Sequence, residues 1–212
     1  MASVTFDQFL PEILPEVAGV PHPLAINAVR NACFDFCRQS LIWNEFQDPE
    51  AYAQGVAEYE VGTPSGAQVV QVLSITLDDG RTIAPTSADV AVAARPNWRT
   101  AEGVIEAFVQ SAPDVFRFVA VPNGDGQFTA QVAYAPLRSA TSIDAALFNL
   151  YLEPIKYGAL WKLKSTVNQA WSDPTGAAYN HQMFQQAIGK AVTERVRSNS
   201  RASLRVAPVS FA

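Results

Sequence analysis

Few residues in this chain have the types and spacing that chemistry requires. Among 212 residues there are two cysteines and two histidines. Cys33 and Cys37 are spaced one helical turn apart on an apolar face, where disulfide geometry is poor. We therefore predict buried thiols, with a metal half-site that lacks partner ligands as the alternative. His181 has no neighbouring serine or cysteine to complete a catalytic triad, and His22 lies in a turn typical of a surface or capping residue.

Paired carboxylates could act as acid and base or bind a metal, and Asp78-Asp79 is one such pair. The pair precedes Gly80, however, and Asp-Gly is a strong signal for a tight hairpin turn. The sequence also contains no glycine-rich phosphate loop, nucleophile elbow or dinucleotide fingerprint. We predict that the protein is not an enzyme and has no catalytic, cofactor-binding or metal-binding residues.

Composition points instead to surface that other subunits cover. The chain is 49% hydrophobic and only 17% charged, a combination at the apolar end for a soluble protein. A well-packed monomer is the alternative. No apolar run approaches the roughly 20 residues of a membrane span, and the acidic start, interrupted by Pro11 and Pro15, does not resemble a signal peptide. We therefore expect synthesis and folding in a cytoplasm, without a membrane partner.

The net charge of −5 conceals an asymmetry between the two ends. Residues 1–60 contain nine acidic and two basic residues, whereas residues 181–212 contain five basic residues and one acidic residue. The basic end could attract an acidic partner, or it could be a solvated helix end where cations are favoured. An acidic chain does not favour tight, direct DNA binding.

The elements that carry most of the apolar surface are two helices predicted over residues 142–198. The first is capped by Ser142 and has apolar side chains around most of its circumference, with a kink expected at Pro154. The second follows Asp173-Pro174, a helix-start signal in which the aspartate caps and the proline takes the first helical position. A short linker makes the two an antiparallel hairpin whose apolar area exceeds what one small subunit can cover.

The rest of the chain divides into a helical start, a β-rich middle and a terminal arm. Helices are expected at Thr5–Glu16 and Pro23–Trp43, followed by an exit loop over 44–55. Alternating patterns then predict strands, among them 69–77 with its hairpin return, 104–110, 115–121 and 127–135. The fold class predicted is α+β: a helical bundle, made of the N-terminal helix and the C-terminal helical hairpin, with an inserted antiparallel β-sheet and an extended C-terminal arm. The domain boundaries are 1–55, 56–136, 142–198 and 199–212.

Several blocks of residues resemble tailed-bacteriophage head-to-tail adaptor (connector) proteins. The blocks are Phe36-Cys37-Arg38-Gln39-Ser40-Leu41-Ile42-Trp43, Tyr157-Gly158-Ala159-Leu160-Trp161-Lys162-Leu163, Trp171-Ser172-Asp173-Pro174 and Phe184-Gln185-Gln186-Ala187-Ile188, in this order around a β-rich insertion. The resemblance covers most of the chain. Its motifs are structural, since no catalytic signature accompanies them.

This resemblance implies a structural virion protein of the neck, assembled in the host cytoplasm. Members of the family form a ring, typically of twelve subunits, which docks onto the portal protein and connects it to a tail or nozzle protein around the DNA channel. DNA is then only a passing cargo. The resemblance further implies that the C-terminal segment docks on the portal, through Arg197, Arg201, Leu204, Arg205, Val206, Val209 and Phe211.

Contacts between ring neighbours are expected on the helical hairpin. Leu147, Tyr151, Ile155 and Trp161 are the candidates, to be divided between the subunit core and the subunit interface. Two other functions remain open: a head-completion or tail-terminator ring, and a small hydrolase or carbohydrate-binding module with a site at Trp98.

Overall fold

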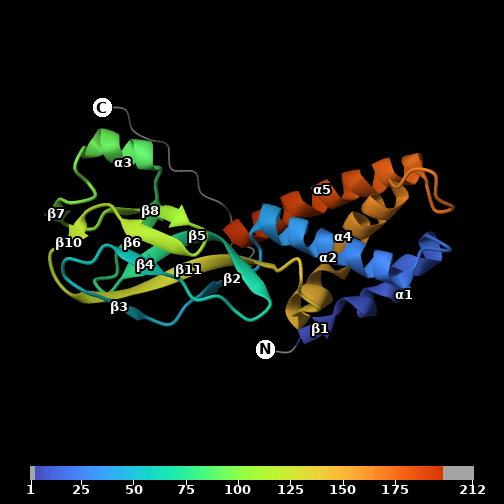
Figure 1. Cartoon of the computed structure of the whole chain (residues 1–212), viewed down its shortest axis with the longest axis horizontal. Helices are drawn as coiled ribbons and strands as arrows, with labels where there is room; N and C mark the ends of the chain where they lie inside the picture. Colours follow the sequence, from blue (N-terminus) through green and yellow to red (C-terminus); the bar gives the residue numbers. More distant parts are fainter. Residues whose placement is uncertain (1–2, 198–212) are drawn as a thin grey trace.

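The computed structural model describes residues 3–197, which form an elongated molecule with a helical part at one end and a β part at the other (Figure 1). The chain starts in the helical part, crosses to build the β part, and returns to finish the helical part. Each part has a hydrophobic core of its own.

A short two-stranded sheet closes the N-terminal end of the helical part. β1 (Ser3–Thr5) pairs antiparallel with β12 (Ser142–Asp144). The 3-10 helix η1 (Phe6–Phe9), helix α1 (Leu10–Ile13) and the 3-10 helix η2 (Leu14–Glu16) follow β1. The helical segment predicted here is confirmed, but it is broken into single turns, since α1 and η2 each restart with a proline in their first turn.

Three long helices make up most of the helical part: α2 (His22–Ser40), α4 (Ala145–Lys164) and α5 (Pro174–Val196). α2 ends at Leu41, which adopts a left-handed conformation with φ 54°. The predicted start of α5 is confirmed, because Asp173 Oδ1 accepts a hydrogen bond from the Gly176 N–H at 2.9 Å. This cap satisfies an N–H that no earlier turn of the helix can pair.

The start of α4 differs from the prediction. Ser142 belongs to β12, and Asp144 caps the helix by accepting from the Ala146 N–H at 2.7 Å. The kink predicted around Pro154 is confirmed, but it is centred on Tyr151, whose φ of −126° and ψ of 23° are not helical. A proline ring displaces the carbonyl four residues earlier, so the distortion falls one turn before Pro154.

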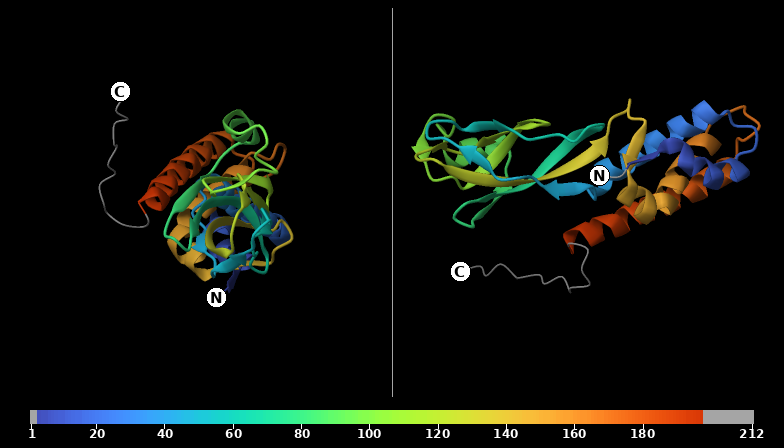
Figure 2. Two further views of the ribbon diagram at one scale, coloured as in Figure 1. Left: turned by 90° about the vertical axis from the view of Figure 1, so that its left-hand side faces the viewer. Right: turned by 90° about the horizontal axis from the view of Figure 1, so that it is seen from below.

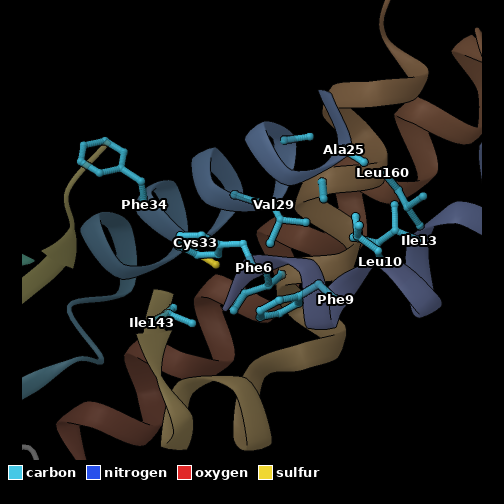
Figure 3. Close-up of a cluster of buried hydrophobic side chains, with 14 of the residues drawn as sticks. Phe6, Phe9, Leu10, Ile13, Ala25, Val29, Cys33, Phe34, Ile143 and Leu160 are labelled. Atoms are coloured by element: carbon cyan, nitrogen blue, oxygen red, sulfur yellow. The ribbon is translucent and has the colours of Figure 1, made fainter. Parts of the chain in front are cut away.

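The helical core is tightly packed around small residues. Val29 and Cys33 of α2 lie among aromatic and aliphatic side chains from η1, α1 and α4 (Figure 3). Gly158 of α4 marks the closest approach, since a Cβ there would lie 2.8 Å from the Phe184 ring and 2.9 Å from Ala32 Cβ. The lack of a side chain at this position lets other helices approach α4 closely.

The β part is built on one curled sheet of eight strands. Its strand order is β2-β11-β5-β6-β8-β9-β4, and β3 also pairs with β11. The strands are β2 (Asn44–Phe46), β3 (Glu50–Tyr52), β4 (Glu58–Glu60), β5 (Ala67–Leu77), β6 (Thr82–Pro85), β8 (Ala107–Ala112), β9 (Val115–Phe118) and β11 (Gly126–Pro136). A second, small sheet pairs β7 (Glu102–Gly103) with β10 (Val121–Pro122), and α3 (Ala88–Ala94) covers one end of the β part (Figure 1).

The strand predictions hold for most strands of the sheet and fail for β2 and β3. β5 and its hairpin return β6 were expected, as were β9 and β11. The strand predicted over 104–110 begins later, as β8. The exit loop predicted over 44–55 is wrong, because β2 and β3 both lie in it and pair with β11.

The sheet curls around in the end-on view (Figure 2), and buried phenylalanines form much of its hydrophobic core. Phe108, Phe116 and Phe118 are fully buried, and Phe128 is 2% exposed. The Phe116 ring contacts the rings of Phe118 and Phe128 edge-on, at centroid distances of 5.3 and 5.2 Å. Edge-to-face packing of this kind adds to the free energy that burial of the rings already supplies.

These findings overturn the predicted fold class. The sheet is not an antiparallel insertion into a helical bundle, because β6 and β8 pair in parallel and the eight strands curl around a core of their own. In the described part of the chain the three long helices form one end of the molecule and do not enclose the sheet (Figure 1). The physical reason is the row of phenylalanines, which gives the strands enough apolar area to fold on themselves.

Candidate functional site

The structure divides the four predicted interface residues between the core and the surface. Leu147 is 5% exposed and Ile155 is fully buried, and both belong to the helical core. They are therefore covered within one subunit. Tyr151 and Trp161 are half-buried and line the side of α4 that faces α5.

Tyr151 connects the kink of α4 to the end of α5. Its ring lies 5.2 Å from the Phe36 ring, and its hydroxyl donates a hydrogen bond to Glu194 Oε2 at 3.1 Å. Burial raises the pKa of Tyr151 to about 12, and the negative charge of Glu194 adds to this effect. The phenol is therefore a neutral donor at any physiological pH.

Trp161 is held on its outer side by α5. Its ring stacks on His181 at 4.2 Å with an interplanar angle of 25°, and the Lys162 ammonium lies 4.9 Å from its centroid. Lys162 also forms a 2.6 Å salt bridge with Asp35 of α2. No sequence pattern pairs His181 with Trp161, because the packing of α4 against α5 brings the two residues together.

The seam between α4 and α5 leaves large apolar side chains open to solvent. Leu150 is 70% exposed and Tyr179 is 57% exposed. A groove of 330 Å³ beside Leu150 is lined by Pro154, Tyr157 and Met183 among others. Tyr157 also lines a second groove, of 490 Å³, which includes Tyr179, so the two grooves share this residue in their walls. We call this surface the α4–α5 seam.

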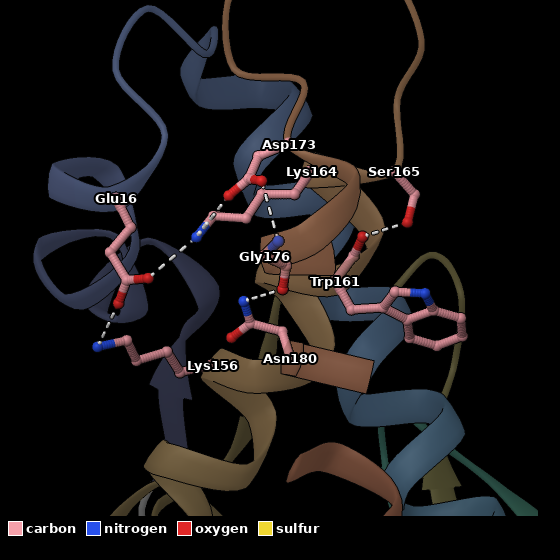
Figure 4. A network of polar contacts seen from close by, with 8 residues as sticks. All are labelled: Glu16, Lys156, Trp161, Lys164, Ser165, Asp173, Gly176 and Asn180. Atoms are coloured by element: carbon pink, nitrogen blue, oxygen red, sulfur yellow. Dashed lines mark hydrogen bonds and ion pairs between the residues drawn. The ribbon is translucent and has the colours of Figure 1, made fainter. Parts of the chain in front are cut away.

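A polar network holds the second groove rigid (Figure 4). Glu16 of η2 accepts from Lys156 at 2.9 Å and from Lys164 at 3.3 Å, and Lys164 also lies 3.9 Å from Asp173. Burial on its own would raise the pKa of Glu16, but the two lysines outweigh it and the pKa is lowered. The network joins the N-terminal segment, α4 and the cap of α5, so it orients the helices that form the seam.

Only the first of the predicted portal-binding residues can be placed. Arg197 lies exposed at the end of α5. Arg201, Leu204, Arg205, Val206, Val209 and Phe211 lie outside the described residues. The end of α5 reaches the junction with the β part, because Ile42, close to the start of β2, packs in one cluster with Ala191 of α5.

The residues considered for chemistry have structural roles in this fold. Asp79 accepts from the Arg81 N–H at 2.9 Å and forms a salt bridge with its side chain at 2.6 Å, and these contacts to Arg81 lower its pKa. Cys33 and Cys37 are free and fully buried, as predicted, and burial raises the pKa of Cys37 to about 12. Within residues 3–197 no group of three or more metal-ligating side chains occurs.

The cavity beside Trp98 does not resemble a hydrolase site. Trp98 is 2% exposed, so its face is not available to a sugar. The cavity has a volume of 570 Å³ and is lined by Arg99 and Arg117, with Glu58 as its one carboxylate. Glu58 lies 3.6 Å from Arg117. A pair of convergent acids, which a hydrolase of this kind requires, is therefore missing from the lining.

Exposed apolar side chains on helices fixed by buried contacts and salt bridges are typical of proteins that assemble with others. A sequence profile of the SU10 adaptor protein family matches residues 7–207. Because the match spans nearly the whole chain, this protein belongs to the SU10 adaptor protein family, a family of phage head-to-tail adaptors. The resemblance drawn from the sequence blocks is thus confirmed.

No curated protein matches the chain significantly. Membership of the family supports a structural adaptor role in a bacteriophage. Among the described residues, no helix combines the length and apolar character needed to cross a bilayer.

Proposed function

We propose that this protein forms a ring in the neck of the virion, docked onto the portal protein and joined on its other side to a tail or nozzle protein. The ring surrounds the channel through which DNA passes. Twelve subunits is the number that the resemblance implies. The observation that carries this proposal is the α4–α5 seam, which leaves Leu150 and Tyr179 exposed on rigid helices of a phage adaptor.

In this proposal the seam of one subunit contacts a different face of the next. A ring requires such heterologous contacts, because each subunit must offer two unlike surfaces that fit each other. Tyr151 and Trp161 border the seam, whereas Leu147 and Ile155 support it from the core. The interface we propose is therefore centred on Leu150, which was not among the four candidates chosen from the sequence.

A charge change in the seam tests the ring. Leu150→Glu should prevent assembly while the subunit stays folded, because a carboxylate buried at an interface without a partner costs several kcal/mol. Val104→Glu is the control, since Val104 is also exposed, at 55%, but lies in the β part. Negative-stain images of each variant with portal protein provide the measurement. Rings formed equally well by Leu150→Glu would contradict the proposed interface.

Docking onto the portal is assigned to the basic C-terminal arm, residues 199–212 with Arg197 at its base. Deletion of residues 201–212 should leave a folded subunit that no longer binds portal protein in a pull-down. Portal binding at the wild-type level by the deletion variant would show that the arm is not the docking element. Circular dichroism of the deletion variant checks that the subunit is still folded.

A head-completion or tail-terminator ring would share the seam and differ only in its partner. Binding to purified portal protein separates the two, since a tail terminator would bind the tail tube instead.

A further inference from the structure

A second surface, unrelated to the seam, lies where the edge strands of the curled sheet meet. β2 and β4 are the two terminal strands in the order of the sheet. A groove of 630 Å³ runs between the β2–β3 connection and the end of β4. Its lining consists of Glu45, Phe46, Gln47, Asp48, Pro49, Glu50, Glu60, Val61, Gly62, Pro64 and Tyr134. We call it the edge groove.

The edge groove combines negative charge with an exposed aromatic ring. Four carboxylates line it, no basic residue does, and Phe46 is 66% exposed. None of the four carboxylates forms a salt bridge with another described residue. Phe46 is thus a large apolar side chain left in solvent between unpaired acids, an arrangement suited to a partner that carries both arginines and apolar residues.

The floor of the groove is fixed. The Gln47 amide donates to Gly62 O at 2.6 Å and lies 2.8 Å from the Tyr134 hydroxyl, so it joins the two sides. Tyr134 is 2% exposed at the bottom. Its burial raises its pKa, and the charge of Glu45 acts in the same direction. The groove therefore exists before any partner binds, which lowers the entropic cost of binding.

The C-terminal segment of the same chain has the complementary chemistry. Residues 198–212 contain Arg201 and Arg205, no acidic residue, and the apolar residues Leu204, Val206, Val209 and Phe211. Arginine forms paired hydrogen bonds with carboxylates, and an apolar side chain can cover Phe46. The alternation of Leu204, Arg205 and Val206 is also the pattern by which an extended peptide binds beside an edge strand.

The distance allows the segment to reach the groove of its own subunit. α5 ends at Val196, beside the junction between the two parts (Figure 1). Ile42 packs against the cluster that contains Ile188 and Ala191 of α5, and it precedes Glu45 by only three residues. Fifteen residues follow Arg197 in the sequence, enough for a span of about 50 Å when extended.

We propose that the edge groove binds residues 198–212 of the same chain before assembly, and that the portal takes this segment from the groove. The interaction keeps the apolar residues of the segment covered in the free subunit. Binding within one chain is favoured over binding between chains because the linkage gives a high effective concentration. Binding of the segment in the groove does not depend on the proposed portal docking. Only the second step, in which the portal displaces the segment, rests on that proposed function.

The test uses the full-length protein without any portal protein. A benzophenone amino acid placed at position 211, in Phe211→p-benzoylphenylalanine, is activated by light, and mass spectrometry locates the products. We expect cross-links to residues 45–64 within one chain. Mixing chains labelled with ¹⁴N and ¹⁵N identifies links between chains, and a majority of such links would overturn the proposal.

Variants in which carboxylates are neutralised test whether the cross-links depend on specific binding in the groove or on random collisions of the segment with the surface. The triple variant Asp48→Asn, Glu50→Gln, Glu60→Gln should lower the cross-link yield at least fivefold, because the arginines lose their partners. The control variant carries the same number of neutralised, exposed acids elsewhere in the β part: Asp89→Asn, Glu102→Gln and Glu106→Gln.

The control variant should keep the wild-type yield. Equal yields from the groove variant and the control would overturn the proposal. Arg201→Glu with Arg205→Glu, which leaves all described residues unchanged, should lower the yield to the same extent as the groove variant. Since no portal is present, failure here leaves the portal-binding test unaffected.

Discussion

The helical part and the β part solve the same packing problem with different residues. Small side chains in the helical part, such as Gly158 and Ala32, let helices approach one another closely. In the β part, large rings such as Phe116 and Phe118 fill the space inside a curled sheet. The close approach of the helices therefore depends on small residues, whereas the core of the sheet depends on large rings.

This difference extends to the surfaces. The helical part exposes the α4–α5 seam, where Leu150 lies on a helix held by salt bridges on either side. The β part exposes the edge groove, where Phe46 lies among unpaired carboxylates. Exposed apolar side chains on fixed helices suit permanent contact between subunits, and a charged groove suits a contact that can be exchanged.

The largest effect should follow from emptying the aromatic core. Phe116→Ala should lower the free energy of unfolding by about 3–5 kcal/mol, because the buried ring is lost and its neighbours cannot fill the cavity. Phe46→Ala, the same substitution at an exposed ring, should change it by less than about 0.5 kcal/mol. Urea unfolding measures both values. Similar losses from the two variants would mean that the two rings do not differ in burial as the structure shows.

Hydrogen exchange on Phe116→Ala would sharpen the comparison. Amides of β9 and β11 should lose more protection than those of α2 and α4, because Phe116 contacts only the β core. Uniform loss across the chain would show that the two parts open together.

A smaller effect is expected from adding a single carbon to the helical core, which should lower the free energy of unfolding by about 1–3 kcal/mol. Gly158→Ala places a Cβ within 3.0 Å of Phe184 and Ala32, so the helices must separate. Gly189→Ala is the matched control in α5, where a Cβ would meet nothing within 4 Å. There the higher helix propensity of alanine should stabilise the protein by about 0.5–1 kcal/mol. Thermal unfolding gives the change in Tm of each variant. A change of the same sign in both variants would refute the close approach at Gly158.

The smallest effect concerns pH. The pKa of Tyr151 is raised to about 12 in the folded protein, above the value of about 10 for an unfolded tyrosine. Folding therefore favours the neutral phenol, and this contribution to stability is complete below pH 10 and is lost as the pH rises towards 12. Absorbance at 295 nm should show a late-titrating tyrosine that disappears in Tyr151→Phe. A late transition that persisted in this variant would belong to another residue.

The sequence predicted elements whose signals are local. Asp173-Pro174 predicted the start of α5, Asp79-Gly80 the β5–β6 hairpin, and Pro154 a kink in α4, and each depends on neighbouring backbone groups. The strands β2 and β3 were missed because each has three residues. Strands this short have no periodicity to detect, and only pairing with β11 defines them.

The candidate surfaces were predicted less well than the helices that carry them. Leu150 of α4 is exposed, but two of the four residues selected on this helix, Leu147 and Ile155, are in the core. The kink at Tyr151 changes the direction of α4 between its first turns and the rest of the helix. A periodicity that assumes a straight helix therefore does not assign buried and exposed faces correctly on both sides of the kink. Phe46 was missed because it lies in a segment taken for a loop.

The sequence by itself determined where α5 starts, which cysteines remain reduced and buried, and the family to which the chain belongs, since these follow from local chemistry and from ordered residue blocks. Only the tertiary structure decided that the sheet curls around its own phenylalanines, that Leu150 is exposed while Ile155 is covered, and that distant acids share one groove. Those properties depend on which residues meet across long stretches of chain, and the free energy of such contacts is absent from any local pattern.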